Sequence, residues 1–314
     1  MKPSFARPEL KNQTGNNKTY KSVIGCLDGT VPILRNTKEF NVNSQFFAEK
    51  YFHPLLADSP GTHIAGVRSL NGPFHGVEAL FDAYNQFIEP DQASYSQIYI
   101  GSGLNNQVNF ISAGFMINPS FFRDGRIWSY GFWKGKDGKG CYNTACSGFV
   151  QVSSEIPIVK PIDNLKPGEP VWWRCSVHQD KNTGNWWITQ LIPNAPYKVD
   201  IGYWPKELFN LLNNGSNMAG VGGVVQASRS NSSPQMGNGK YPDKRYKNTA
   251  IFANIEVLDS NYKQRRWDYF PWEELLDCSK FYRISYGYEA YLYEHTQFGF
   301  YFNYGGPGGN TCGI

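Results

Sequence analysis

The sequence lacks the features that would place a chain across a membrane or on nucleic acid. No apolar run approaches the roughly 18 residues that a bilayer-spanning helix needs. The formal net charge is only +4 over 314 residues, and lysine and arginine form no dense cluster. The electrostatic pattern of a protein that binds nucleic acid or an anionic membrane is therefore missing. We expect neither as a partner.

Patterns for binding a metal are missing as well. The chain has five histidines and six cysteines, and the closely spaced Cys141 and Cys146 are accompanied by no second pair and no nearby histidine. A zinc site needs about four such ligands at characteristic spacings. We expect no metal and no cofactor, and the cysteines are more typical of disulfides in an oxidising compartment.

The N-terminus, Met-Lys-Pro-Ser-Phe-Ala-Arg-Pro, has no apolar segment of the kind found in a signal peptide. Glycosylation acceptors of the Asn-x-Ser/Thr type are nevertheless present, at Asn12, Asn17, Asn214 and Asn231. Together with the cysteines they indicate a secreted, extracellular protein. The simplest reconciliation is that the signal peptide is missing from a truncated start.

What the sequence does contain is a residue pattern typical of β-strands. From about His63 onward, short runs rich in aromatic and β-branched residues alternate with Gly, Asn, Asp and Pro. In Tyr95-Ser-Gln-Ile-Tyr-Ile100, alternate side chains would point to opposite faces of a sheet. The cluster Asp180-Lys-Asn-Thr-Gly184 lies between two such runs and predicts a hairpin, and Asp137-Gly138 predicts another reversal.

These signals predict an all-β fold, an antiparallel β-sandwich related to a jelly roll, with one short helix. The helix is expected after Pro205, where Leu208, Leu211 and Leu212 recur at helical spacing. Residues 1–57 differ from the rest, because a polar stretch precedes a turn-like Cys26-Leu-Asp-Gly segment. We therefore divide the chain into an N-terminal extension, 1–57, and one sandwich domain, 58–314.

Five strings follow one another along nearly the whole chain: Cys141-Tyr-Asn-Thr-Ala-Cys-Ser-Gly-Phe-Val-Gln151, Gly184-Asn-Trp-Trp187, Gly202-Tyr-Trp-Pro205, Gln235-Met-Gly-Asn-Gly239 and Tyr304-Gly-Gly-Pro-Gly-Gly-Asn310. In sequence, order and spacing they resemble the neprosin family of plant secreted peptidases. The resemblance implies a glutamic-class endopeptidase that cuts after proline, with an antiparallel β-sandwich fold. It also implies that residues 1–57 are the later part of an activation peptide.

The resemblance further implies two disulfides, Cys141 with Cys146 and Cys278 with Cys312. Cys26 and Cys175 stay unassigned, because a bridge needs Cα atoms within about 7 Å and sequence alone does not establish that distance.

Catalysis in the resembled family uses two glutamates, one activating water and the other protonating or polarising the scissile amide. The first lies in an Ile-Glu-Ala-Gly string, which here reads Ile111-Ser-Ala-Gly-Phe115 and puts Ser112 at the glutamate position. The second lies in Trp-Gly-Gly-Glu-Val, which here reads Val-Gly-Gly-Val-Val and puts Val224 there. Neither side chain can act as an acid or base near neutral pH, so glutamate chemistry is expected to be lost.

Two other routes to hydrolysis are disfavoured by the sequence. To act as a nucleophile, Ser112 would need a histidine as its base, but no histidine lies in a nucleophile-elbow context. Glu155 or Asp124 would need a second acid to divide the roles of acid and base.

Aromatic residues suggest that the cleft still binds, because Trp and Tyr faces stack on proline and sugar rings. The candidates are Trp186, Trp187, Tyr203 and Trp204. Our first hypothesis is an inactive homologue, expected to be monomeric, that binds a peptide or protein ligand rich in proline. The alternatives are an active glutamic-type endopeptidase and a lectin-like glycan binder.

Overall fold

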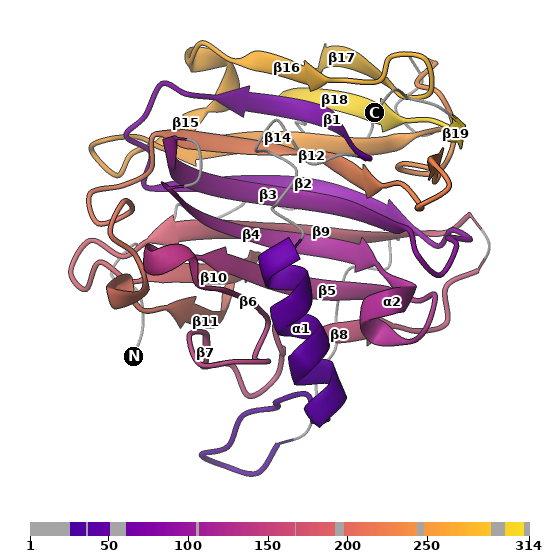
Figure 1. Cartoon of the computed structure of the whole chain (residues 1–314). Helices are drawn as coiled ribbons and strands as arrows, with labels where there is room; N and C mark the ends of the chain where they lie inside the picture. The colour runs from indigo at the N-terminus through magenta and orange to yellow at the C-terminus, as the bar shows by residue number, and fades with distance from the viewer. Residues whose placement is uncertain are drawn as a thin grey trace.

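Two antiparallel sheets form the protein. The computed structural model describes residues 26–35, 37–50, 61–104, 107–166, 168–191, 198–243, 248–289 and 299–310. Sheet I has the strand order β16-β1-β12-β3-β4-β5-β6, with β8 paired to β5, and Figure 1 shows it in front. Its strands are β1 (Thr62–Ser69), β3 (Ala93–Leu104), β4 (Gln107–Ile117), β5 (Ile127–Lys134), β6 (Gly140–Tyr142), β8 (Lys160–Ile162), β12 (Met218–Gln226) and β16 (Glu273–Leu276).

Sheet II lies behind sheet I and has the order β17-β18-β14-β2-β9-β10-β11-β7, with β15 paired to β14. Its strands are β2 (Gly76–Tyr84), β7 (Val150–Gln151), β9 (Pro170–Gln179), β10 (Trp186–Leu191), β11 (Lys198–Trp204), β14 (Ala250–Leu258), β15 (Gln264–Arg266), β17 (Arg283–Glu289) and β18 (Gly299–Gly305). A small third pair joins β13 (Ser232–Ser233) to β19 (Gly309–Asn310). The predicted all-β antiparallel sandwich is confirmed.

Both predicted chain reversals are present. Strands β9 and β10 pair around the Asp180 turn, where Asp180 Oδ1 accepts from the backbone N–H of Asn182 and Thr183. Gly184 closes this turn at φ +76°, a conformation that glycine adopts without steric cost. Strands β5 and β6 pair around the 3₁₀ turn η1 (Lys136–Gly138).

Alternation along β3 and β4 assigns each side chain to one face of sheet I. Ile98 and Ile111 point between the two sheets into the main core, while Tyr99 and Phe110 belong to a second cluster on the outer face. Period-two patterning therefore builds two apolar layers with one strand pair, one inside the sandwich and one outside it.

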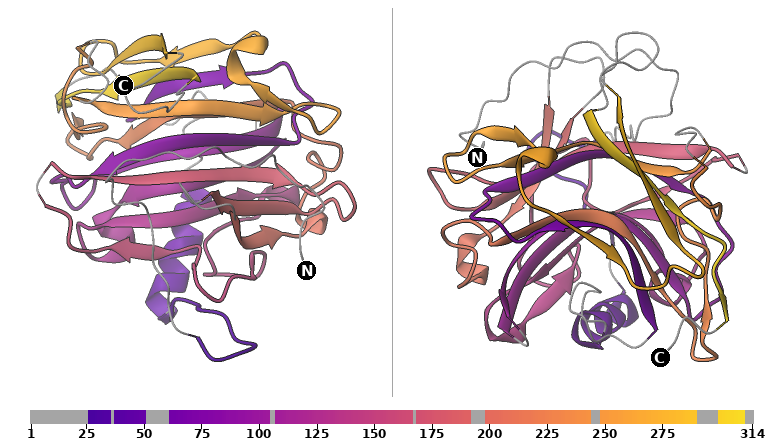
Figure 2. Two further views of the ribbon diagram at one scale, coloured as in Figure 1. Left: turned by 180° about the vertical axis from the view of Figure 1, so that it is seen from behind. Right: turned by 90° about the horizontal axis from the view of Figure 1, so that it is seen from above.

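The outer layer is covered by α1 (Lys38–Lys50), which the sequence reading did not anticipate. Its inward positions Phe40, Ser44, Phe47 and Ala48 recur at helical spacing, and Phe47 and Ala48 join the outer cluster. Figure 2, in the view from above, shows α1 inside the curve of sheet I. A four-residue helix, α2 (Pro119–Phe122), packs beside it.

The predicted helix after Pro205 is wrong in length. Only a 3₁₀ turn, η2 (Lys206–Leu208), forms there, because Phe209 returns to an extended conformation at φ −117°. Leu212 is buried instead, and its carbonyl accepts from Trp186 Nε1. The remaining 3₁₀ turn is η3 (Trp267–Tyr269). Within the ranges given above, no helix is long and apolar enough to cross a bilayer.

One predicted disulfide, Cys141–Cys146, is present with Cα atoms 6.2 Å apart. Cys278 is also disulfide-bonded, but Cys312 lies outside the described residues, so their pairing stays a prediction. Cys26 and Cys175 are thiols, and Cys175 is fully buried in the main core.

Asn214 and Asn231 are exposed, which leaves both acceptors accessible. Asn12 and Asn17 lie outside the described residues.

Candidate functional site

Ser112 and Val224 lie on the same outer face of sheet I but do not face each other. Ser112 on β4 is level with Tyr99 of β3, whereas Val224 on β12 is level with Tyr95, four residues away along the same strand. Four residues and two strand spacings put their Cα atoms about 17 Å apart, by standard strand geometry. Ser112 and Val224 therefore share one face of sheet I but lie on different cross-strand levels of it.

The residue of β12 that is level with Ser112 is Gly220. The pairings run from Ser112 to Tyr99 and from Tyr99 to Gly220. A Cβ added to Gly220 would overlap the phenol oxygen and Cζ of Tyr99. The phenol thus fills the place that a side chain at position 220 would take, and glycine is the residue that admits it.

The same row continues to Arg68 on β1 and Glu273 on β16. The Arg68 guanidinium bonds Glu273 Oε1 through Nε and Nη2, both at 2.6 Å. Glu273 is therefore held by a cation at the sheet edge. Four strand spacings separate it from Ser112, about 19 Å, so it cannot share one water with that hydroxyl.

A buried polar chain runs along the next row. Tyr130 donates its hydroxyl proton to Gln97 Oε1, and the Ser112 hydroxyl also bonds Tyr130. Burial raises the pKa of Tyr130 well above its ordinary value, and burial likewise raises the pKa of Tyr99. Both phenols therefore keep their protons at any physiological pH.

Two other polar atoms of this face have no hydrogen-bond partner among the described residues. Tyr99 Oη and Gln97 Nε2 are both inaccessible to solvent, and no acceptor bonds either of them within the described part of the chain. Buried donors in native proteins almost always have an acceptor, so an unpartnered pair calls for an explanation.

The outer face is closed by α1. Phe40 and Phe47 pack against Phe121 of α2 with ring centroids 5.0 and 5.5 Å apart. The cluster formed in this way also contains Tyr99, Phe110 and Phe132, among other residues. A ligand reaching Ser112 must therefore displace α1 or enter beside it.

The two acids that could replace the missing glutamates, Asp124 and Glu155, do not lie near Ser112 on sheet I. Asp124 accepts from Trp128 Nε1 at 2.9 Å and pairs with Arg126, in the turn between α2 and β5. Glu155 is exposed on a loop.

The described histidines have partners away from Ser112: His63 is paired with Asp277, His75 with Gln179 and His178 with Ser176. His53 and His295 lie outside the described residues.

The aromatic residues proposed for binding belong to the other sheet. Trp186 and Trp204 pair across β10 and β11 and point into the main core, and Trp187 is also inaccessible to solvent. Tyr203 is partly exposed and packs on Trp187 with centroids 4.8 Å apart. The expected aromatic binding set is therefore wrong for the three tryptophans, because rings this buried offer no face to a ligand.

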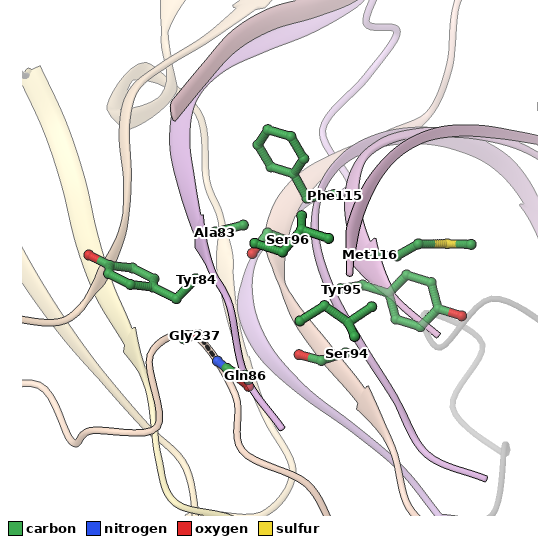
Figure 3. Close-up of a pocket in the computed structure, with 11 residues that line it drawn as sticks. Ala83, Tyr84, Gln86, Ser94, Tyr95, Ser96, Phe115, Met116 and Gly237 are labelled. Atoms are coloured by element: carbon green, nitrogen blue, oxygen red, sulfur yellow. Dashed lines mark hydrogen bonds between the residues drawn. The ribbon is translucent and has the colours of Figure 1, made fainter. Parts of the chain in front are cut away.

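Figure 3 shows a small pocket at the end of the sandwich, where β2, β3 and β4 converge. Its volume of about 10 Å³ suits one water molecule. Tyr84, in its lining, donates to the buried carboxylate of Asp82 at 3.0 Å. Burial raises the pKa of Asp82 to about 7. The pocket is too small for a side chain of a peptide.

Residues that the sequence reading missed make up most of the site: Arg68, Gln97, Tyr99, Tyr130 and Gly220. The period-two pattern from Tyr95 could have put Gln97 and Tyr99 on one face. It could not have put Gly220 beside Tyr99, because that requires the register between β3 and β12.

A model of the Neprosin family matches residues 90–307 of this chain. Among solved structures, scytalido-glutamic peptidase with a transition state analog inhibitor is similar at 11% identity, covering 77% of this chain and 98% of that one, with a TM-score of 0.39. SCP-B, a member of the eqolisin family in complex with the tripeptide Ala-Ile-His, shows 10% identity with the same coverages and a TM-score of 0.36.

Tailspike protein 2 of Escherichia coli O157:H7 bacteriophage CAB120 matches at 14% identity over 60% of this chain and 20% of that one, with a TM-score of 0.29. At these TM-scores the structural likenesses carry no argument about chemistry. The family match rests on the sequence of residues 90–307.

Proposed function

Because this chain belongs to the Neprosin family, we propose that it is a secreted, non-catalytic member that binds extended, proline-rich peptide on the outer face of sheet I. The observation that carries the proposal is the row Ser112, Tyr99, Gly220. It holds a hydroxyl, a phenol and a glycine, and none of these can take a proton from water at neutral or acid pH.

The loss of chemistry does not depend on which residue of β12 is the second position. Val224 has no ionisable group, and Gly220 has no side chain at all. The acid of the same row, Glu273, is bound to Arg68. Removing both an acid and a base costs far more than the roughly 10²- to 10⁴-fold credited to one of them.

We propose that residues 1–57 are an activation-peptide-like segment, and that its helix α1 covers the binding face until it is displaced. Its contact with the sheet rests on Phe40 and Phe47. Apolar docking of this kind is reversible, because a short isolated helix is marginal in water and depends on packing. Peptide binding and α1 docking are then competing events.

The test is a cleavage and binding assay on the full chain. Proline-rich peptides are incubated with the purified protein from about pH 3 to 7, a range that brackets the ordinary glutamate pKa of about 4.3. Mass spectrometry is expected to show intact peptide, and titration calorimetry to show binding that strengthens in the F40A/F47A variant. Cleavage that disappears in Ser112→Ala would overturn the non-catalytic assignment in favour of an active peptidase.

A further inference from the structure

Two phenylalanine rings of α1 lie against one aromatic ring on the outer face of sheet I. Phe40 packs edge to face on Phe121 of α2, with ring centroids 5.0 Å apart, and lies 6.1 Å from Phe122. Phe47 contacts the same Phe121 ring at 5.5 Å. With α1 in place, Phe121 is only 1% exposed. The helix thus shows which side chains this part of the face accepts: two aromatic rings, both on Phe121.

Phe121 is held in position by its neighbours on the sheet side. The Asn118 side chain caps α2 by accepting from the Phe121 backbone N–H at 3.0 Å, and Pro119 lies in the first turn. Phe122 stacks on Trp128, with ring centroids 4.1 Å apart and ring planes 4° apart. A ring that is fixed in advance loses little side-chain freedom when a partner packs on it, and this favours binding.

A series of aromatic contacts connects this ring with the position of Ser112. Phe121 lies 5.2 Å from Tyr142, and Tyr142 lies 6.0 Å from Tyr130. The Ser112 hydroxyl bonds Tyr130. All three rings are almost inaccessible to solvent in the structure with α1 docked. An aromatic surface of this size is rarely left open to water, so a ligand that displaces α1 has to cover it in turn.

An extended chain can match the spacing of the two α1 rings. Phe40 and Phe47 are seven residues apart, which is about 10.5 Å and almost two full turns of an α-helix, so both rings are on one side. A polyproline II chain rises about 3.1 Å per residue with three residues per turn. Two residues three positions apart are therefore about 9.3 Å apart on one side of such a chain. Spacings of two or four residues turn one ring roughly 120° away.

We propose that the proline-rich ligand carries two aromatic residues three positions apart, in the form aromatic-Pro-Pro-aromatic, and that their rings take the places of Phe40 and Phe47 against Phe121. This inference rests on the proposed function, because it names the side chains by which the face selects its peptide. The two prolines hold the chain in the extended conformation in advance, whereas a short free helix is marginal in water. The proline-rich chain therefore loses less conformational entropy on binding.

The experiment measures the binding of synthetic proline-rich peptides of equal length by titration calorimetry at pH 7. Three peptides carry two phenylalanines at spacings of two, three and four residues, and a fourth carries alanine at both positions of the three-residue spacing. The protein is the full chain carrying F40A/F47A, which weakens α1 docking. The three-residue spacing is expected to bind at least about tenfold more tightly than the other three peptides, because each of those buries one ring or none.

Phe121→Leu tests where the peptide rings bind, because it removes the aromatic ring and keeps an apolar side chain. It is combined with leucine in place of one peptide phenylalanine in a double-mutant cycle. An edge-to-face ring pair is expected to give a coupling of about fivefold in affinity. The matched control is Phe87→Leu, because Phe87 is 82% exposed on the loop between β2 and β3, and it is expected to give no coupling. Thermal unfolding of both variants checks that they are folded.

The remaining outcomes contradict the proposal in different ways. Equal binding of the alanine peptide overturns the aromatic requirement and leaves proline-rich binding standing. Tighter binding of the two- or four-residue spacing overturns the extended geometry, and absence of coupling overturns the assignment to Phe121. A free peptide of the α1 sequence, Lys38–Lys50, that binds more tightly than every proline-rich peptide would mean that the face recognises a helix. Failure of all proline-rich peptides to bind overturns the proposed function and this inference together.

Discussion

Tyr99 and Gly220 are matched across β3 and β12: the phenol of Tyr99 occupies the space that a side chain at Gly220 would need. The pair sits level with Ser112. The place where a second acid could oppose position 112 is therefore filled by a neutral ring.

Gly220→Ala is expected to destabilise the protein by about 1–3 kcal/mol, the usual cost of overpacking a close-packed site. The added methyl would overlap Tyr99 and lie 2.7 Å from the Val67 carbonyl oxygen. Chemical denaturation measures the change. Tyr99→Ala should relieve part of it in a double-mutant cycle, and Gly125→Ala is the control, because nothing lies within 4 Å of a Cβ there. Additive effects would mean that Tyr99 and Gly220 are not coupled.

Installing two acids should depend on the register. S112E/V224E is expected to stay inactive, because carboxylates about 17 Å apart at the backbone cannot share one water. S112E/G220E with Tyr99→Ala, which clears space above position 220, puts two acids level across β3. It is the combination expected to cleave proline-rich peptide near pH 4. Mass spectrometry of the products measures cleavage, and Tm checks that each variant is folded. Activity of S112E/V224E would contradict this prediction.

Asp82 should make the protein less stable as pH rises. Burial outweighs the bonds from the Ile251 N–H and the Tyr84 hydroxyl and raises the folded-state pKa from 3.8 to about 7. Between these values the folded state holds a proton that the unfolded state has lost. Stability therefore falls from about pH 4 to about pH 7, with a limiting slope of about 1.4 kcal/mol per pH unit, and levels off above.

The measurement for Asp82 is urea denaturation of wild type and Asp82→Asn between pH 4 and 8. The difference in unfolding free energy should follow this course, because the amide does not titrate. A difference that stays constant across the range would show that Asp82 ionises normally in the folded protein.

Phe47→Ala should loosen α1. Phe47 is 9% exposed and packs on Phe121, so truncation removes most of the apolar contact on that turn of the helix. Hydrogen exchange of the α1 amides should speed up at least about tenfold, the change produced by roughly 1.4 kcal/mol of lost docking energy. Val42→Ala is the control on the same helix, because Val42 is 61% exposed. Equal exchange in both variants would mean that α1 is not held by this ring.

Much of the fold could be predicted from local pattern. The hairpin around Asp180 and the reversal at Asp137 depend on turn chemistry within a few residues, and both formed as expected. The helix after Pro205 failed for the opposite reason. Its leucine spacing was real, but Leu212 was needed in the core beside Trp186, and tertiary packing overrode a weak local preference.

The candidate site divides in the same way. The assignment of Ser112 to the first acid position is a prediction from the surrounding string, which aligns without gaps. The residue of β12 that is level with Ser112 could not be predicted, since Gly220 takes that place only through the pairing of β3 with both β4 and β12. Trp186, Trp187 and Trp204 looked like a binding surface because composition does not say which sheet face is covered.

By itself, then, the sequence determined the class of fold and the family, and it predicts a missing acid at Ser112, because strand alternation, turn residues and family strings are local properties. Only the tertiary structure decided that Tyr99 covers Gly220, that Val224 is out of line and that α1 closes the face. Those facts depend on register, where a shift by one residue reverses the face that every side chain occupies.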